Sequence, residues 1–282
     1  MIRRLLLVAG LVVLCVPFAP TAQQLPVAAK SLKFAVIGDN GDGSKAQFEV
    51  GAQMTQVRAT FPYELVLMLG DNMYGRQRPA DFVTKFERPY APILQAGVPF
   101  YAAIGNHDSS ATLSYDGFNM GGKRYYTFAR KNVRFFVLDT NLLERTQIEW
   151  LNDRLRETRE EWRIAYFHHP LYSDGDRHGS NEELRVLLEP LLVEHGVRVV
   201  FAAHDHVYSR SNPQKGIVHF VEGSSGRLRK GGVTPTSMTA ASFDQDQTFM
   251  LVEVVGDVLS FRTMSRTGRV VDSGVIQRRA ET

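Results

Sequence analysis

Polar side chains that can bind metal ions follow apolar segments at five places along this 282-residue chain. The five groups are Asp39, Asp71, Asn106-His107, His168-His169 and His204-Asp205-His206. Each group alone has an ordinary explanation as a turn, a helix cap or surface polarity. Together they supply carboxylate, imidazole and amide oxygen donors, which suit divalent and trivalent ions.

The number of donors exceeds what one ion normally needs. A shared carboxylate such as Asp71 could bridge two ions ~3.5–4 Å apart, the spacing of two-metal hydrolytic sites. His204 and His206 are two residues apart, so on an extended chain their side chains point the same way and could face one ion each. The residues therefore indicate a two-metal site, provided that the fold brings the five groups together.

The segments that precede these groups are typical of buried β-strands. Continuous apolar runs of this length suit strands that are covered on both faces. Seven runs are present: LKFAVIGDNG, YELVLMLGDN, VPFYAAIGNHD, VRFFVLDTN, WRIAYFHHP, VRVVFAAHDH and GIVHFVEGSSG. In open α/β sheets ligands bind beyond the carboxyl ends of the strands, so we expect the polar groups to meet there.

Helical segments lie between several of these runs. Apolar residues at spacings of three and four predict a helix within residues 47–61. Two further helices, each opening with the spacing of a capping box, are expected at 146–155 (Thr146 and Glu149) and 180–196 (Ser180 and Glu183). The alternation of strands and helices predicts a layered α/β fold.

The C-terminal part of the chain changes character. Residues 248–277 contain apolar runs separated by the turn sequences Gly256-Asp257 and Thr267-Gly268, a pattern typical of antiparallel strands. We find no internal repeat and no segment that requires a second domain. One domain is therefore expected over residues 32–282.

The first 22 residues have the pattern of a secretory signal peptide, with Arg3 and Arg4, an apolar run from Leu5 to about Pro20, and then small residues. A retained membrane anchor is the alternative, but the run is short for a bilayer span, which needs ~20 apolar residues. We expect export to the periplasm or the extracellular space, with residues 23–31 as a linker.

Cysteine content and charge argue against a disulfide-linked protein, a thiolate enzyme and a nucleic-acid-binding protein. Cys15 is the only cysteine, so the exported chain would have no disulfide and no thiolate chemistry. Loss of Arg3 and Arg4 would lower the formal net charge from +3 to +1, and this near-neutral balance does not support nucleic-acid binding. We expect a monomer without stable membrane association once the signal peptide is removed.

Five short motifs resemble those of the calcineurin-like metallophosphoesterases, and specifically their purple acid phosphatase branch of tartrate-resistant acid phosphatase-like enzymes. The family motifs read Gly-Asp-x-Gly, Gly-Asp-x-x-Tyr, Gly-Asn-His-(Glu/Asp), Val-x-x-His and Gly-His-x-His. They occur here in order as GDNG (38–41), GDNMY (70–74), GNHD (105–108), AYFH (165–168) and AHDH (203–206). Five ordered motifs are a specific signal. Ala165 and Ala203 depart from the family pattern beside the ligands.

The resemblance implies a sandwich of two mixed β-sheets flanked by helices, with two bound metal ions. The first ion, usually Fe(III), would be held by Asp39, Tyr74 and His206. The second, a divalent ion such as Fe, Zn or Mn, would be held by Asn106, His168 and His204. Asp71 would bridge the two ions.

Two histidines are candidate catalytic residues. By the resemblance, His107 would protonate the leaving alkoxide or orient the phosphate. His178, in the segment HHPLYSDGDRHG, follows the fourth motif at about the place where animal-type members have a further histidine; a solvated loop is its alternative. Arg227, Arg229 and Lys230 also have two interpretations: they attract an anionic substrate, or they form a solvated basic loop without a role in the site.

The expected activity is hydrolysis of a small phosphate monoester by attack of metal-bound hydroxide, as in acid phosphatases. Two ions can neutralise an anionic substrate and lower the pKa of a water molecule, and a neighbouring imidazole can donate a proton. An exported phosphodiesterase or nucleotidase of the same superfamily is the first alternative. By the resemblance, cyclic-nucleotide phosphodiesterases and Ser/Thr phosphatases of this superfamily carry Asp-x-His, which residues 39–41 lack. A non-catalytic metal-binding protein is the second, and it would be expected to lose ligands or His107, which are all present.

Overall fold

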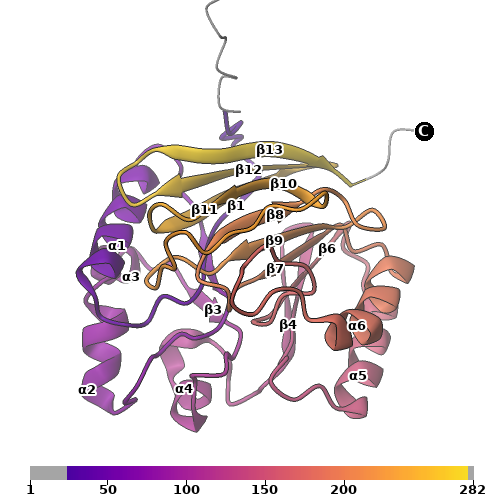
Figure 1. Ribbon diagram of the computed structural model, residues 1–282, viewed down its shortest axis with the longest axis horizontal. Coiled ribbons are helices and arrows are strands. Elements are labelled where there is room, and N and C mark those ends of the chain that lie inside the picture. The colour runs from indigo at the N-terminus through magenta and orange to yellow at the C-terminus, as the bar shows by residue number, and fades with distance from the viewer. Residues whose placement is uncertain (1–23, 279–282) are drawn as a thin grey trace, which may run out of the picture.

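Two mixed β-sheets flanked by helices form the framework of the molecule (Figure 1). The structure, a computed structural model, describes residues 24–278. The first sheet has six strands in the order β13-β12-β11-β1-β2-β3. Their bounds are β1 Leu32–Ile37, β2 Leu65–Met68, β3 Phe100–Ala102, β11 Thr248–Val255, β12 Val258–Ser265 and β13 Val270–Gln277.

The second sheet has seven strands in the order β10-β8-β9-β7-β6-β5-β4. Strands β1, β2 and β3 run parallel in the first sheet, and β5, β6, β7 and β9 run parallel in the second. Each sheet therefore presents a row of carboxyl ends at one edge. The bounds in the second sheet are β4 Tyr126–Arg130, β5 Val133–Val137, β6 Trp162–Tyr166, β7 Val199–Ala202, β8 Tyr208–Ser211, β9 Val218–Glu222 and β10 Thr239–Phe243.

Aromatic side chains fill the space between the two sheets. The ring centroid of Phe34 in β1 lies 5.4 Å from that of Phe135 in β5 and 6.2 Å from that of Phe201 in β7. Phe220 in β9 contacts Phe261 in β12 with 5.0 Å between the centroids. All five rings are buried, and each aromatic ring removes about 150–250 Å² from water. This packing holds one row of carboxyl ends against the other.

Helices cover the outer faces of both sheets (Figure 1). In α1 the side chains of Val50 and Met54 join the core of the first sheet. On the other side, Leu151 in α5 and Leu188 in α6 pack against the second sheet. The helices are α1 Lys45–Arg58, α2 Pro79–Phe82, α3 Ala91–Gln95, α4 Ser110–Ser114, α5 Arg145–Glu157 and α6 Glu182–Glu194, with a π-helical turn at Val83–Glu87 and a 3₁₀ turn at Asp116–Phe118.

The predicted α/β sandwich is confirmed. All seven apolar runs contain strands, and the C-terminal tail forms two antiparallel hairpins through β11, β12 and β13. Strands β4, β8 and β10 lie outside the predicted set, because none of their sequences is a continuous apolar run. They complete the edges of the second sheet rather than its buried centre.

The two predicted capping boxes are wrong. Helix α5 begins one residue before Thr146 and has Glu144 as its N-cap. Helix α6 is capped by Asn181, whose side chain accepts a backbone hydrogen bond at 2.9 Å. The Ser180 hydroxyl is turned toward the preceding loop instead, where it accepts a hydrogen bond from the backbone N–H of Ser173 at 3.0 Å. A contact with the preceding loop therefore moves the cap by one residue.

Residues 1–22, the predicted signal peptide, lie outside the described residues, and export stays a prediction. The following segment is attached to the first sheet, because the backbone N–H groups of Val27 and Ala28 donate to the Glu253 carboxylate in β11 at 2.6 Å each. Within residues 24–278, no helix combines the length and the apolar character that crossing a bilayer requires.

Candidate metal centre

Five strand ends deliver the predicted ligands to one edge of the sandwich. Strands β1, β2, β3, β6 and β7 are followed by Asp39, Asp71, Asn106, His168 and His204 respectively. The backbone is left-handed at three of these residues, with φ of 51° at Asp39, 50° at Asp71 and 70° at His204. Such values are uncommon outside glycine, and strained backbone of this kind clusters at functional sites.

Asp39, Tyr74 and His206 form one cluster. The Tyr74 hydroxyl donates to Asp39 Oδ1 at 2.6 Å and lies 3.1 Å from His206 Nε2. The same histidine nitrogen lies 3.5 Å from Asp39 Oδ1. Asp39 and Tyr74 are buried and His206 is half-buried. Three donor atoms from distant segments of the chain thus converge on one point.

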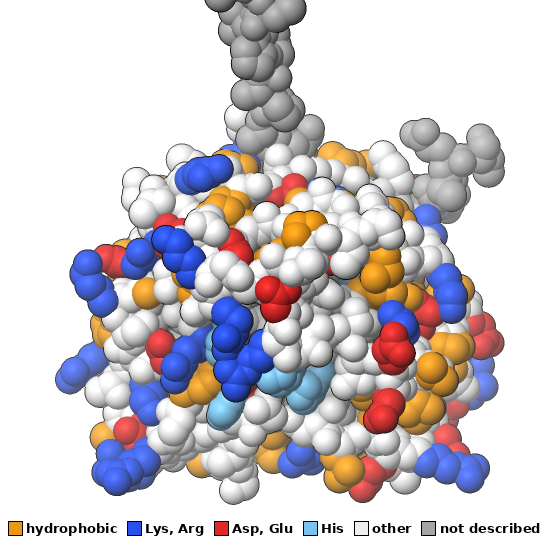
Figure 2. Space-filling model, in the orientation of Figure 1, with side chains coloured by type: hydrophobic (Ala, Val, Ile, Leu, Met, Phe, Trp, Pro, Cys, Tyr) orange, Lys and Arg blue, Asp and Glu red, His pale blue; other side chains and the backbone are white. Residues whose placement is uncertain are grey.

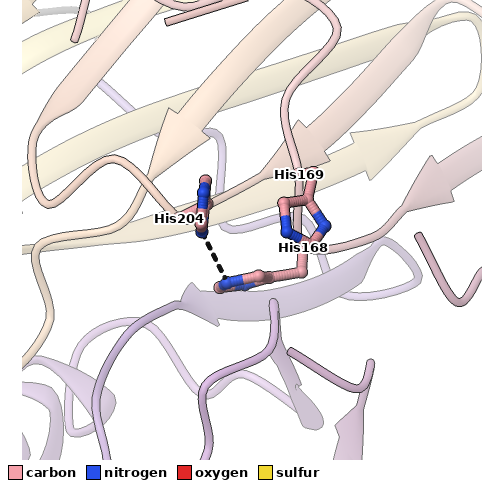
Figure 3. Close-up of side chains that lie close together, drawn as sticks. All are labelled: His168, His169 and His204. Atoms are coloured by element: carbon pink, nitrogen blue, oxygen red, sulfur yellow. Dashed lines mark hydrogen bonds between the residues drawn. The ribbon is translucent and has the colours of Figure 1, made fainter. Parts of the chain in front are cut away.

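Asn106, His168 and His204 form a second cluster. His168 Nε2 lies 3.0 Å from Asn106 Oδ1 and 3.1 Å from His204 Nδ1. Figure 3 shows the contact between these two imidazoles, with His169 beside them. His168 Nδ1 lies 3.0 Å from the backbone oxygen of Leu69. Because that oxygen can only accept, Nδ1 carries the proton and Nε2 the lone pair in the neutral ring.

Asp71 lies within reach of both clusters. Its Oδ1 is 3.4 Å from His168 Nε2 and accepts a hydrogen bond from the backbone N–H of His107 at 2.8 Å. Ligand atoms of Asp39, Asp71 and His168 all lie within 4.8 Å of one another. The carboxylate of Asp71 therefore has the position that a shared ligand requires.

The electrostatics of the site favour a bound cation. Burial opposes ionisation of Asp39, but its hydrogen bond to His206 and the nearby His168 outweigh burial and lower the pKa of Asp39 to about 2. Burial raises the pKa of Asp71, and the charge of Asp39 adds to this effect. Two adjacent buried carboxylates repel each other, and a positive ion between them removes that penalty.

The donor set also fits a metal ion in detail. The lone pair of His168 Nε2 faces Asn106 Oδ1 and Asp71 Oδ1, which are acceptors, so a cation between them would satisfy all three. Burial lowers the pKa of His204 to about 2, which keeps the imidazole neutral as a ligand must be. Burial raises the pKa of Tyr74, and the neighbouring carboxylates add to it, so only a strongly polarising ion would displace the phenol proton.

Two motif glycines permit the strand ends to approach each other. Gly105 precedes Asn106, and a Cβ atom there would lie 2.1 Å from the backbone nitrogen of Asp71. Gly70 has φ of +95°, and a Cβ atom there would lie 2.6 Å from His168 Nδ1. A residue with a side chain at either position would displace a ligand, which explains the glycine in the GD and GN motifs.

Asp108 ties the loop after β2 to the loop after β3. Its Oδ2 accepts hydrogen bonds from the Asn72 side chain at 2.7 Å and from the backbone N–H of Gly105 at 2.9 Å. Its Oδ1 accepts from the backbone N–H of Met73 at 3.0 Å. These bonds hold the segments of Asp71 and Asn106 in a fixed relation.

Both candidate catalytic histidines reach the centre. The ring centroid of His107 lies 4.8 Å from that of Tyr74, and its Nε2 lies 3.9 Å from Asp71 Oδ2. The ring centroid of His178 lies 4.0 Å from that of His204. The two histidines line a cavity of about 320 Å³ together with Asp71, Tyr74, Asn106, Arg177, His204, His206 and Arg227.

Asp205 has no separate role in the sequence-based predictions, yet it holds the loop that carries His178. Its buried carboxylate accepts hydrogen bonds from the Ser173 hydroxyl at 2.6 Å and from the backbone N–H groups of His178 and Gly179 at 3.1 Å each. The signal in the sequence is its position between the two histidines of AHDH. The backbone turns at His204, where φ is 70°, so alternation along a strand does not give the direction of the Asp205 side chain.

His169 stands beside the second cluster. Its Nδ1 lies 2.9 Å from the Thr140 hydroxyl, and its ring centroid lies 4.4 Å from that of His204. Ligand nitrogens of His168, His169 and His204 lie within 4.8 Å of one another (Figure 3). Burial lowers the pKa of His169 to about 3, so this imidazole is neutral and can supply a further donor.

The three basic residues that follow β9 differ in their relation to the cavity. Arg227 lines the cavity, whereas Arg229 and Lys230 are absent from its wall. Figure 2 shows Lys and Arg side chains next to the histidines on this face of the molecule. Arg177, which precedes His178, also lines the cavity and was not among the predicted site residues. Its approach depends on the loop held by Asp205, which has no periodic sequence pattern.

The fold and the clustered donors are those of a metal-dependent phosphoesterase, and comparison with protein families identifies the chain. The family described as calcineurin-like phosphoesterase matches residues 32–208, more than half of the 282 residues. The chain therefore belongs to the calcineurin-like phosphoesterase family and is a hydrolase of the metallophosphoesterase class.

Within this family, the chain is similar to several acid phosphatases and to one solved structure of different description. Tartrate-resistant acid phosphatase type 5 of Oryctolagus cuniculus is 27% identical over 240 residues, covering 70% of this chain and 74% of that protein. Purple acid phosphatase 7 of Arabidopsis thaliana is 26% identical over 290 residues, covering 89% and 87%. Among solved structures, GAP50, described as the anchor in the inner membrane complex of Plasmodium, has a TM-score of 0.76 at 19% identity and covers 89% of this chain and 90% of that chain.

Replacing Asp205 with alanine should release the loop that carries His178. A hydrogen bond to a charged group contributes about 1.5–3 kcal/mol, and about 1.4 kcal/mol corresponds to a tenfold change in an equilibrium. We therefore expect the amides of residues 173–180 to exchange hydrogen for deuterium at least about tenfold faster in Asp205→Ala, measured by mass spectrometry. Asp176→Ala, which removes an exposed carboxylate from the same loop, is the control. Equal exchange in both variants would contradict the role of Asp205.

Proposed function

We propose that this chain is an acid-phosphatase-type enzyme that hydrolyses phosphate monoesters with two metal ions. The observation that carries the proposal is the convergence of the predicted donors into two clusters within reach of Asp71. The similarity to tartrate-resistant and purple acid phosphatases supports the same activity here. The first ion would be held by Asp39, Tyr74 and His206, and the second by Asn106, His168 and His204.

Hydrolysis adds a water oxygen to phosphorus and breaks the bond between phosphorus and the alcohol oxygen. When bound, the ions would neutralise the phosphate and lower the pKa of the attacking water. The departing alkoxide needs a proton. His107 lines the cavity beside Tyr74 with about half of its side chain exposed (53%), so it would donate that proton. His178 would donate a hydrogen bond to a phosphate oxygen.

We infer iron as the first metal because of Tyr74. A phenolate is a hard anionic donor, which suits a trivalent ion. The Tyr74 hydroxyl lies at hydrogen-bond distance from both other members of its cluster, so a single ion could contact all three side chains. The second cluster contains two imidazoles and an amide oxygen, a set that suits divalent Fe, Zn or Mn.

Two alternatives remain as outcomes of the tests. A phosphodiesterase or nucleotidase would use the same family fold with a different substrate. A non-catalytic protein would use the fold for binding alone, and the likeness to GAP50 shows only that the fold is shared. The complete donor set and the presence of His107 in the cavity support catalysis.

Metal-loaded protein should hydrolyse p-nitrophenyl phosphate faster than bis-p-nitrophenyl phosphate. Asp71→Ala removes the ligand that both ions would share, so we expect kcat/KM to fall by about a thousandfold, a loss of roughly 4 kcal/mol. Asp153→Ala, at a half-exposed carboxylate on α5, should leave kcat/KM within about twofold. If metal-loaded protein hydrolyses neither compound, the proposed phosphatase activity is refuted. Preference for the diester would favour a phosphodiesterase.

His107→Asn should impair substrates with poor leaving groups most. General acid catalysis contributes about 10²–10⁴-fold, and an alkoxide needs the proton far more than p-nitrophenolate does. We expect kcat for glycerol 3-phosphate to fall within that range and kcat for p-nitrophenyl phosphate to fall less than about tenfold. Equal losses on both substrates would show that His107 orients the phosphate instead.

Tyr74→Phe should abolish a visible absorption band of the iron-loaded protein. A ferric ion bound to a phenolate has a ligand-to-metal charge-transfer transition, whereas phenylalanine supplies no oxygen. Metal analysis of the same samples by mass spectrometry provides the control for iron content. A colourless wild-type protein that contains iron and is fully active would contradict ferric–tyrosine ligation.

A further inference from the structure

Two arginines border the cavity of the candidate metal centre. The guanidinium carbon of Arg227 lies 4.4 Å from the ring centroid of Tyr74, on the ring that also contacts His107. Its only ion pair within residues 24–278 is a loose one, with 3.7 Å between its Nε and Asp42 Oδ2. The Arg227 charge is therefore held over the cavity without a close carboxylate partner.

Arg177 reaches the same cavity from a different loop. Its position follows from the backbone N–H groups of His178 and Gly179, which Asp205 binds. Across the residues that the structure describes, no carboxylate lies within ion-pair distance of Arg177. This second positive charge is exposed, and unlike Arg227 it has no ion pair within residues 24–278.

The two loops are joined to each other. The backbone N–H of Asp176 donates to the oxygen of Gly232 at 3.0 Å, and that of Thr234 donates to the oxygen of Asp174 at 2.9 Å. Gly175 and Val233 form an isolated antiparallel bridge. These backbone contacts fix the loop of Arg177 against the segment that follows Arg227, so the two loops that carry the arginines are held together beside the cavity.

The arginine pair, Arg177 and Arg227, supplies more positive charge than the scissile phosphate needs. This step rests on the proposed function: a trivalent and a divalent ion, held by two carboxylates and a phenolate and carrying the attacking hydroxide, would keep a single positive charge. A phosphate dianion would turn this into a single negative charge, which one guanidinium group would balance. The two guanidinium groups of the arginine pair would therefore leave the site with an excess of positive charge. A second anionic group on the substrate would restore the balance.

We propose that Arg177 and Arg227 bind a second anionic group, carboxylate or phosphate, on the leaving part of the substrate. Guanidinium binds both groups through paired hydrogen bonds. His107, the expected proton donor to the leaving oxygen, contacts the Tyr74 ring over which Arg227 also lies, so we assign the second anion to the leaving part of the substrate. The natural substrate is therefore a phosphate monoester of an alcohol that carries a further anionic group, rather than of an uncharged alcohol.

A matched pair of substrates tests this. 3-Phosphoglycerate and glycerol 3-phosphate have the same three-carbon skeleton, and only the first carries a carboxylate. We expect wild-type kcat/KM to favour 3-phosphoglycerate by about tenfold or more, the effect of about one charge-assisted hydrogen bond. Arg177→Ala and Arg227→Ala should each remove most of this preference while changing kcat/KM for glycerol 3-phosphate less than about threefold.

Lys230→Ala is the matched control, because it removes an exposed positive charge from the loop of Arg227 without touching the cavity. It should keep the wild-type preference. Arg227→Lys should keep the charge but lose the paired hydrogen bonds, and hence retain only part of the preference. Equal losses on both substrates in the arginine variants would overturn the proposal, since the arginines would then hold the scissile phosphate.

A binding measurement can test the anion site separately from the proposed phosphatase activity. Calorimetric titration of both compounds into metal-loaded His107→Asn protein, in which turnover is slowed, measures the arginine-dependent preference in binding apart from the rate of hydrolysis. Tighter binding of 3-phosphoglycerate that depends on Arg177 and Arg227, in a chain that hydrolyses neither compound, would refute the phosphatase but keep the anion site. No preference in turnover or in binding would refute the anion site alone.

Discussion

The placement of two buried carboxylates next to each other is the constraint on which the rest of this structure depends. Asp39 and Asp71 have ligand atoms within 4.8 Å of the same histidine, and neither side chain reaches solvent to a useful extent. Backbone N–H groups offset part of the repulsion: His204 donates to Asp39 Oδ2 at 2.7 Å and His107 donates to Asp71 Oδ1 at 2.8 Å. Cationic charge placed between the two carboxylates would remove the rest of the repulsion, so this arrangement favours the binding of positive ions.

The two-sheet sandwich makes this arrangement tolerable. Left-handed backbone at Asp39, Asp71 and His204 costs about 1–3 kcal/mol at each residue. The aromatic core between the sheets stabilises the fold by more, since loss of a single buried phenylalanine costs about 3–5 kcal/mol. Strain at the strand ends is therefore compatible with a stable domain, and the rigid strands behind them keep the ligands in register.

The candidate metal ligands and the residues proposed to select the substrate lie in different parts of the molecule. The ligands follow strands of the two sheets, whose positions the core fixes, whereas His178, Arg177 and Arg227 lie on loops. Asp205 links the two, because it lies between two ligands in the chain and binds the loop of His178. Changes in these loops can alter the substrate without disturbing the metal centre, which is consistent with a fold shared among proteins of different description.

The strands along the chain and the candidate ligands that follow them were predictable from the sequence itself, because both are encoded locally. A buried strand needs a continuous apolar run, and the polar residue that ends each run, such as Asp39 or His168, stands out at once. Tertiary structure alone decided that Asp205 would bind the His178 loop and that Asn181, not Ser180, would cap α6. It also decided that Arg177 and Arg227, fifty positions apart in the chain, would line one cavity. These contacts depend on how loops from different parts of the chain pack against one another, for which the neighbouring residues in the sequence carry no signal.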